Sequence, residues 1–247
     1  MHKIGFTKKL QSQTTGIRNL KLSLYLKTEI PLPPLEIQKQ VVERLDKVVE
    51  AQKLNDDLIQ KSDELFQSLL HKELNPTGKD WGTKKLGEVI EISYGKGLSR
   101  DSRVDSGKYF AYGSNGPVYR TNESLTNGEI IVIGRKGTAG ALYFISDPCW
   151  PIDTTFFAKP KNDVSLKFVY YLLQTKGLPR LAIVTGVPGI NRTTLANVNV
   201  QLPPINTQKQ IAAKLSTVQD YKTQLLAQKS KLKELFNSVL SKSFSGQ

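Results

Sequence analysis

The sequence contains few of the residues that form disulfides or bind metals. It has one cysteine, Cys149, and two histidines in 247 residues. One cysteine cannot form an intrachain disulfide, and this set is too small for a closed zinc site. No run of 18 apolar residues occurs, so no membrane span is predicted. The basic N-terminus has no apolar segment behind it, which argues against a secretory signal. We therefore expect a cytoplasmic protein that binds no metal.

Motifs of nucleotide binding and covalent catalysis are also missing from the sequence. GKG at Gly95 lacks the third glycine of a dinucleotide fingerprint, and no G-x-x-x-x-G-K-[ST] phosphate loop occurs. The Asn-Pro-Pro-Tyr motif with which adenine methyltransferases hold a flipped base is absent. Cys149 and His71 lie in different segments with no pattern that supports a nucleophile–base pair. We predict no catalytic residue and no cofactor bound to this chain.

Acidic residues are scarce relative to basic ones. The chain has 35 Lys and Arg against 22 Asp and Glu, which gives a formal net charge of +13 and a pI near 9.7. Such an excess attracts polyanions over long range, and nucleic acid is the usual partner. The alternative is that the positive charge only keeps the protein soluble.

One segment near the N-terminus recurs at an offset of 170 residues. LPPLEIQKQVVERL begins at Leu32 and LPPINTQKQIAAKL at Leu202, with seven of fourteen positions identical; LFQSLLHKEL at Leu65 matches LFNSVLSKSF at Leu235. Each copy continues for some forty residues without proline or glycine behind its Pro-Pro pair, where proline is compatible with a helix start. The repeat predicts two long helices, within residues 31–75 and 202–247.

Apolar residues recur in both copies at spacings of three and four, the heptad pattern of a coiled coil. Residues 31–75 hold six basic and nine acidic side chains, whereas residues 202–247 hold seven and two. Opposite charge favours pairing of one copy with the other, within a chain or between chains. A coiled coil with no further role is the alternative. The predicted pairing residues are Val41, Leu45, Val48, Ile59, Phe66, Leu69, Ile211, Leu215, Val218, Leu225, Leu232, Phe236 and Val239, with polar interruptions at Gln52, Asn55, Ser62, Lys222 and Lys229.

Residues 76–201 have a different composition, with fifteen of the eighteen glycines and both tryptophans. The runs LGEVIEISY, EIIVIG, ALYFI, TTFFA and VNVQL predict strands. SLKFVYYLLQTK predicts an amphipathic helix with Ser165 as its N-cap. We predict an α+β fold in which one globular α/β domain is flanked by the two long coiled-coil-forming helices.

Four glycine-rich loops of this domain carry cations: GKGLSRDSR, YGSNGPVYR, IGRKGTAG and VPGINR. Glycine lets backbone N–H groups approach a phosphate closely, and the cations add charge. For any one loop, an ordinary β-turn with a solvated charge is the alternative. Arginine suits guanine edges and asparagine suits adenine. We therefore assign base contacts to Arg100, Arg103, Asn115, Arg120 and Arg192, and phosphate contacts to Lys96, Arg135 and Lys136.

The order of these segments resembles the specificity subunit of Type I restriction–modification enzymes. The resemblance rests on IPLPPLEIQKQ with its long helix, YGSNG, IGRKG, CWPIDTTFF, and GINR ahead of the second Pro-Pro, and it covers essentially the whole chain. It implies that residues 76–201 are a target-recognition domain that reads half of a split site in double-stranded DNA. In that family the subunit is not an enzyme. Methyltransferase (modification) subunits bring S-adenosylmethionine, and restriction/translocation subunits bring ATP and Mg.

The chain departs from the family pattern ahead of the first Pro-Pro pair. A full subunit has two recognition domains, each followed by a long helix, whereas about thirty residues stand here. Residues 1–30, including TTGIRNLKLSLYL, resemble the last piece of such a domain, which implies a natural half-length form or a truncated product. We hypothesise a homodimer that pairs through its helices and reads a symmetric split site. The alternatives are an assembly scaffold that docks methyltransferase subunits without reading DNA, and an unrelated coiled-coil DNA-binding regulator.

Overall fold

The computed structural model describes residues 11–14, 17–27, 29, 32–161, 163–184 and 186–245. They fall into two compact units, one within residues 1–57 and 227–247 and the other within residues 58–226. Each long helix contributes to both units. None of the helices in the described ranges combines the length and apolarity needed to cross a membrane.

The repeated segment forms two long helices. Helix α3 spans Leu35–Leu74 and helix α7 spans Ile205–Ser245. Each begins directly behind its Pro-Pro pair, because proline has no N–H to offer inside a helix and its fixed φ suits the entry. The absence of proline and glycine from both stretches then allows about eleven uninterrupted turns at 3.6 residues per turn. These two helix predictions are confirmed.

A glutamine shared by both copies fixes each helix entry. Gln38 Nε2 donates to the Pro33 carbonyl oxygen at 2.7 Å, and Gln208 Nε2 donates to the Pro203 carbonyl oxygen at 2.8 Å. The prolines and the glutamine of the repeated segment thus form the same hydrogen bond twice. Gln208 is buried and its Oε1 also accepts from the Ser165 backbone N–H at 3.0 Å, which ties the second copy to the globular domain.

Within residues 58–226, α3 and α7 pair in antiparallel fashion. Lys214 Nζ lies 3.1 Å from Glu73 Oε1, and Lys222 pairs with Asp63 further along both helices. The residue number therefore rises in α3 as it falls in α7. Phe66 of α3 and Leu215 of α7 are buried in this part of the pair. The charges allowed the two helices to pair within one chain or between chains. In the structure they pair within one chain.

The same antiparallel order holds within residues 1–57 and 227–247. Lys229 Nζ lies 2.9 Å from Asp56 Oδ1, and Gln52 Nε2 donates to the Leu232 carbonyl oxygen at 3.3 Å. The ion pairs between the helices all join an acid of α3 to a lysine of α7, as their opposite charges predicted. The thirteen predicted pairing residues are all buried or half-buried. The polar interruption Asn55 is buried as well.

The globular domain contains a four-stranded antiparallel sheet in the order β4 (Ile90–Tyr94), β10 (Thr155–Pro160), β7 (Ile130–Gly134) and β8 (Leu142–Ile145). All five residues of β7 are buried, as a continuous apolar run predicts. Helix α5 (Leu166–Gln174) packs beside β8, with the Phe144 and Tyr170 rings 5.6 Å apart. Its predicted N-cap is confirmed, since Ser165 Oγ accepts from the Phe168 N–H.

A second sheet has the order β6 (Gly116–Thr121), β5 (Tyr109–Gly113) and β9 (Trp150–Pro151). Strands β5 and β6 form an antiparallel hairpin with an irregularity between Ala111 and Tyr112, and β9 runs parallel to β5. The sequence had suggested a loop over YGSNGPVYR. That interpretation was wrong, because only the turn at Ser114 and Asn115 connects two strands here.

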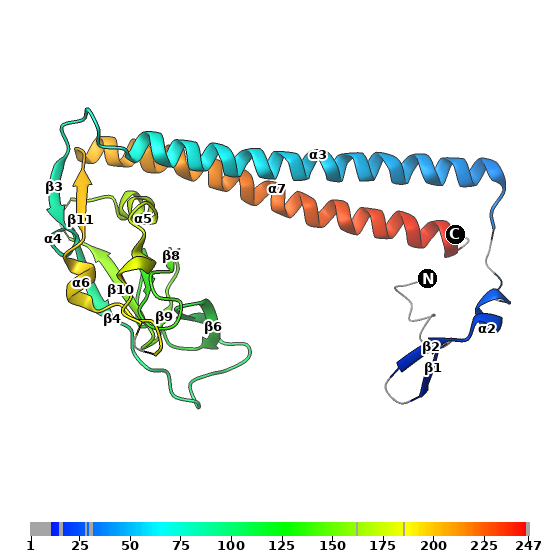
Figure 1. The fold of residues 1–247 in the computed structure, drawn as a ribbon, viewed down its shortest axis with the longest axis horizontal. Helices are drawn as coiled ribbons and strands as arrows, with labels where there is room; N and C mark the ends of the chain where they lie inside the picture. Colours follow the sequence, from blue (N-terminus) through cyan, green and yellow to red (C-terminus); the bar gives the residue numbers. More distant parts are fainter. Residues whose placement is uncertain are drawn as a thin grey trace. The chain divides into compact units, whose positions relative to one another are not determined.

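The chain enters and leaves the domain through paired strands. Strand β3 (Gly82–Lys85) lies antiparallel to β11 (Asn199–Leu202), as Figure 1 shows. Short helices follow β3 and precede β11, namely α4 (Leu86–Val89) and α6 (Arg192–Ala196). The sequence had predicted a strand over the whole of LGEVIEISY. Its first four residues are helical instead, because Leu86 and Val89, three apart, both reach the core.

The domain shares one hydrophobic core with the adjoining parts of the long helices. Phe66 and Leu70 of α3 and Leu215 of α7 belong to the same buried cluster as Phe168 of α5. Tyr171 adds polar contacts, with its hydroxyl 3.1 Å from Ser216 Oγ on α7. This common core is why residues 58–226 form one unit.

Ahead of the first Pro-Pro pair, β1 (Gln11–Thr14) and β2 (Ile17–Leu20) form an antiparallel pair, and α2 (Leu22–Leu26) follows. Helix α2 begins thirteen residues before α3, and α6 begins thirteen residues before α7. The offset of 170 therefore extends to these short helices. Residues 1–10 of the predicted domain remnant lie outside the described residues, and that assignment stays a prediction.

Candidate nucleic-acid interface

Two of the predicted base-contacting arginines stack on aromatic rings at the β5–β6 hairpin. Phe110 on β5 is the direct cross-strand partner of Arg120 on β6, and the guanidinium carbon lies 3.9 Å from the ring centroid. Arg103 lies over Tyr119 at 4.2 Å. We call these four residues the arginine–aromatic surface. A guanidinium group held over a ring face by such a cation–π contact can still donate hydrogen bonds through its N–H groups.

Backbone carbonyls anchor both guanidinium groups. Arg103 Nε and Nη2 donate to the Leu98 carbonyl oxygen at 3.3 and 2.9 Å. Arg120 Nη1 donates to the Gly107 carbonyl oxygen at 3.1 Å. Each arginine is thus fixed by a ring and a carbonyl together, so that little side-chain entropy remains to be lost on binding.

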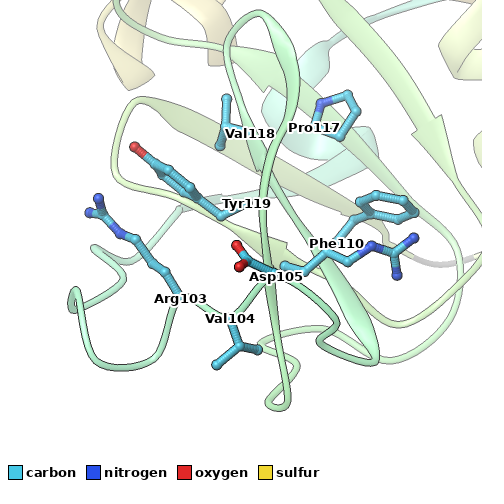
Figure 2. A pocket seen from close by; sticks show the side chains of 8 residues that line it. Arg103, Val104, Asp105, Phe110, Pro117, Val118 and Tyr119 are labelled. Atoms are coloured by element: carbon cyan, nitrogen blue, oxygen red, sulfur yellow. The ribbon is translucent and has the colours of Figure 1, made fainter.

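A cavity of about 380 Å³ lies against this surface. Figure 2 shows Arg103 beside Tyr119, with Asp105 between that pair and Phe110. Phe110 and Tyr119 are about two-fifths exposed. The cavity therefore combines flat apolar surface, arginine donors and one carboxylate acceptor. It is lined by Arg103, Val104, Asp105, Phe110, Pro117, Val118, Tyr119 and Arg120.

A second cluster forms around Tyr94, the last residue of β4. The guanidinium carbons of Arg135 and Arg192 both lie 5.3 Å from the Tyr94 ring centroid, and that of Arg135 lies 6.0 Å from the Phe156 ring. The buried Nε of Arg135 makes no hydrogen bond within the described residues. We call these four residues the Tyr94 cluster. It concentrates two positive charges on one ring.

Hydrogen bonds join the three loops that carry the remaining candidates. The N–H groups of Arg135 and Lys136 donate to the Thr154 carbonyl oxygen, and Gly137 N–H donates to the Pro188 carbonyl oxygen. Ser114 Oγ of the hairpin turn donates to the Lys136 carbonyl oxygen. The structure thus brings the loops with Asn115, Lys136 and Arg192 together, and all three residues are exposed there.

The glycines of the 133–140 loop do not form the phosphate cradle that the sequence suggested. The N–H groups of Gly134, Gly137 and Gly140 donate to protein carbonyls. A Cβ on Gly134 would meet the Thr138 carbonyl oxygen at 2.1 Å, which no side chain tolerates. Glycine is needed here for the turn itself, so any phosphate contact of this loop falls to its side chains.

Lys96 and Arg100 lie on the loop behind β4. Both side chains are exposed and make no hydrogen bond or ion pair with any described residue. The Lys96 backbone is fixed, because its carbonyl accepts from Trp150 Nε1 at 2.7 Å. Arg100 lacks both the ring and the carbonyl anchor that hold Arg103.

The positive charge of the domain has no counter-charge in contact with it. All five ion pairs among the described residues lie on α3 and α7. None of the sixteen basic side chains of residues 76–201 takes part in one. A surface of this kind is suited to a polyanion, because its charges need not be freed from internal partners first.

Other groups in the described residues offer no comparable site. No three His, Cys, Asp or Glu side chains in the described ranges could together hold a metal ion. Burial raises the pKa of the Cys149 thiol, which keeps it in the unreactive neutral form. Sequence reasoning missed Tyr94, Phe110 and Asp105. No spacing signal marks them, because their partners come from other strands and loops.

The family model described as the Type I restriction modification DNA specificity domain matches residues 3–61 and 78–234. The chain belongs to this family. The resemblance noted in the sequence is thereby confirmed. The specificity subunit of the Type I restriction enzyme MjaVIII of Methanocaldococcus jannaschii is similar to this chain, with 26% identity over an alignment of 255 positions that spans 85% of this chain and 60% of that relative. The chain thus spans about three-fifths of its curated relative.

Two solved structures share the fold. The S subunit of a Type I restriction–modification system from M. genitalium is 20% identical, with a TM-score of 0.73, over 96% of this chain and 68% of that one. A structure describing complex assembly and conformational transition of the type I R-M system is 23% identical, with a TM-score of 0.66, over 98% and 67%. The predicted α+β architecture of a globular domain flanked by two long helices is confirmed.

Proposed function

We propose that this chain is the DNA-recognition subunit of a Type I restriction–modification complex. Its domain at residues 76–201 reads one half of a split site in double-stranded DNA. The observation that carries the proposal is the unpaired positive charge of this domain, gathered in the arginine–aromatic surface and the Tyr94 cluster. Membership of the specificity-domain family supplies the context, and the fixed arginines supply groups that read base edges.

The chemistry of such a complex belongs to other subunits. In this proposal the chain is not an enzyme, and it directs methyltransferase and restriction subunits to the site. Those partners bring S-adenosylmethionine, ATP and Mg. The named relative, a specificity subunit of a restriction enzyme, supports this division of labour.

Two copies of the chain complete the recognition unit in our proposal. Since α3 and α7 already cover each other's pairing residues, a second copy requires another face. Leu35, Val42 and Val49 follow one another on α3 at intervals of seven and are 63%, 55% and 49% exposed. An apolar stripe at heptad spacing is the pattern that a partner helix covers. A twofold dimer formed there presents identical domains to identical half-sites.

Selection of bound DNA from a random pool tests this function. The chain is used alone and together with a cognate methyltransferase subunit, and the enriched sequences are read. We expect a motif split by an unread gap. One contiguous motif would instead indicate a coiled-coil DNA-binding regulator. No enrichment under either condition, with the methyltransferase subunit still bound, would indicate an assembly scaffold.

A further inference from the structure

We infer that the cavity at the β5–β6 hairpin reads a G·C base pair through the major groove. Arg120 donates to the guanine edge, and Asp105 accepts from the paired cytosine. This inference rests on the proposed function, because it presumes that the domain binds duplex DNA. It goes further by naming the base pair and the residues that determine it.

The β5–β6 hairpin has the form that enters a major groove. That groove is about 12 Å wide and admits a two-stranded ribbon. Strand β6 lies at the edge of its sheet, with β5 on its inner side. Pro117, Val118 and Tyr119 on β6 are exposed. Apolar side chains at such an edge suit contact with bases more than with the charged backbone of DNA.

Arg120 presents a free fork of donors. Its Nη1 is committed to the Gly107 carbonyl, whereas Nε and Nη2 make no hydrogen bond within the described residues. Two adjacent N–H groups in one plane match O6 and N7 of guanine, the commonest specific contact of arginine in DNA complexes. The Phe110 ring, whose centroid lies 3.9 Å from the guanidinium carbon, restricts the position of this group. Lysine cannot reproduce this arrangement, because its ammonium group is a point charge without a planar fork.

The carboxylate of Asp105 indicates that this cavity binds the edge of a base and not a phosphate. Its carboxylate lines the same cavity as Arg120, and it forms no ion pair among the described residues. A carboxylate repels a phosphate but accepts from the N4 amino group of cytosine. Guanine presents acceptors in the major groove and cytosine presents a donor. The arginine donors and the carboxylate acceptor of this cavity are complementary to that pair.

The test compares the base preference of Arg120→Lys with that of the unchanged chain, by selection from a random DNA pool. We expect Arg120→Lys to lower the preference for guanine at one position of the half-site by at least about fivefold, with the other positions unchanged. Asp105→Asn should weaken the preference at the same base pair. Because Asp105 is exposed, this variant keeps the test decisive if Arg120→Lys fails to fold.

Arg180→Lys is the matched control, since Arg180 is an exposed arginine of the same domain that lies outside this cavity and has no predicted DNA contact, and the base preferences of this variant should stay unchanged. If the unchanged chain enriches a motif and both test variants keep every preference, the proposed function stands and the inference falls. A loss of affinity that is equal on all sequences also overturns it, because it marks a phosphate contact. If the unchanged chain enriches no motif, the proposed function fails and the inference fails with it.

Discussion

Arg135 lies over the Tyr94 and Phe156 rings, and its buried Nε has no acceptor within the described residues. Leaving a buried donor unsatisfied costs about 1–3 kcal/mol, and more for a charged group. A phosphate oxygen would supply both the acceptor and the counter-charge. Arg192 beside the same ring doubles the charge offered to it. Arg135 is therefore suited to the DNA backbone, and Arg192, for which a base contact was predicted, adds its charge at the same ring.

We expect Arg135→Ala to lower DNA affinity by a similar factor on every sequence. The slope of log K against log salt should become shallower by about one, because one fewer counterion is released. Fluorescence anisotropy titrations at several salt concentrations measure both quantities. Lys233→Ala, which removes an exposed charge from α7, should leave the slope unchanged. A loss confined to one target sequence would assign Arg135 to a base.

Cys149 reports on the stability of the domain. Its side chain is 1% exposed, and burial raises the pKa of its thiol. Since only an accessible thiolate reacts with disulfide reagents, labelling of the native chain at pH 8 should be slow and should speed up as urea opens the domain. Stopped labelling followed by mass spectrometry measures the rate. Full modification within seconds in the absence of urea would contradict the burial.

At the scale of elements, the long helices could be predicted from the sequence and the arginine–aromatic surface could not. Pro33-Pro34 and the proline-free run behind it define where α3 begins and how far it extends. By contrast, the pairing of Phe110 with Arg120 depends on the register of a hairpin with an irregularity in it. No sequence spacing encodes that register. The helical turn at Leu86–Val89 was missed because four residues cannot separate a period of two from one of three to four.

The two copies of the repeat supply a matched pair for measuring how the domain is fixed to α7. Gln38 donates one hydrogen bond, whereas Gln208 donates the same bond and also accepts from Ser165. We expect Gln208→Ala to lower the free energy of unfolding by about 1–3 kcal/mol, because it removes two hydrogen bonds and leaves the half-buried Ser165 N–H without its acceptor. Gln38→Ala should cost about 1 kcal/mol or less. Urea unfolding followed by circular dichroism compares them. Equal losses would show that the Ser165 bond contributes nothing.

At the scale of the whole molecule, the stripe of Leu35, Val42 and Val49 governs the proposed dimer. Val49→Glu places a charge in that interface, so the variant should be monomeric where the unchanged chain is dimeric. Folding should be unaffected, because substitutions at exposed helix positions change stability by about 0.5 kcal/mol at most. Light scattering at several protein concentrations gives the mass. Gln40→Glu, two positions away from Val42 and so on another side of the helix, is the control.

A chain that is monomeric at all concentrations, and that binds DNA as one unit, would contradict the dimer. It would leave the reading of a half-site by the single domain intact. The sequence could predict that the helices need partners, because each has an apolar stripe. It could not predict which partner each stripe receives, since the charges allow pairing within a chain and between chains alike.

The adjacency of β3 and β11 has a consequence for how such a protein can change. Because the polypeptide enters the domain and leaves it on neighbouring strands, the segment between Leu86 and Val198 has both of its ends at a single two-stranded stem. A foreign insert whose ends meet at the same stem, and which covers the apolar face that α3 and α7 turn toward α5, would leave both long helices and their ion pairs in place. New target preferences can then arise by exchange of this one segment, without any change in the pairing of α3 with α7.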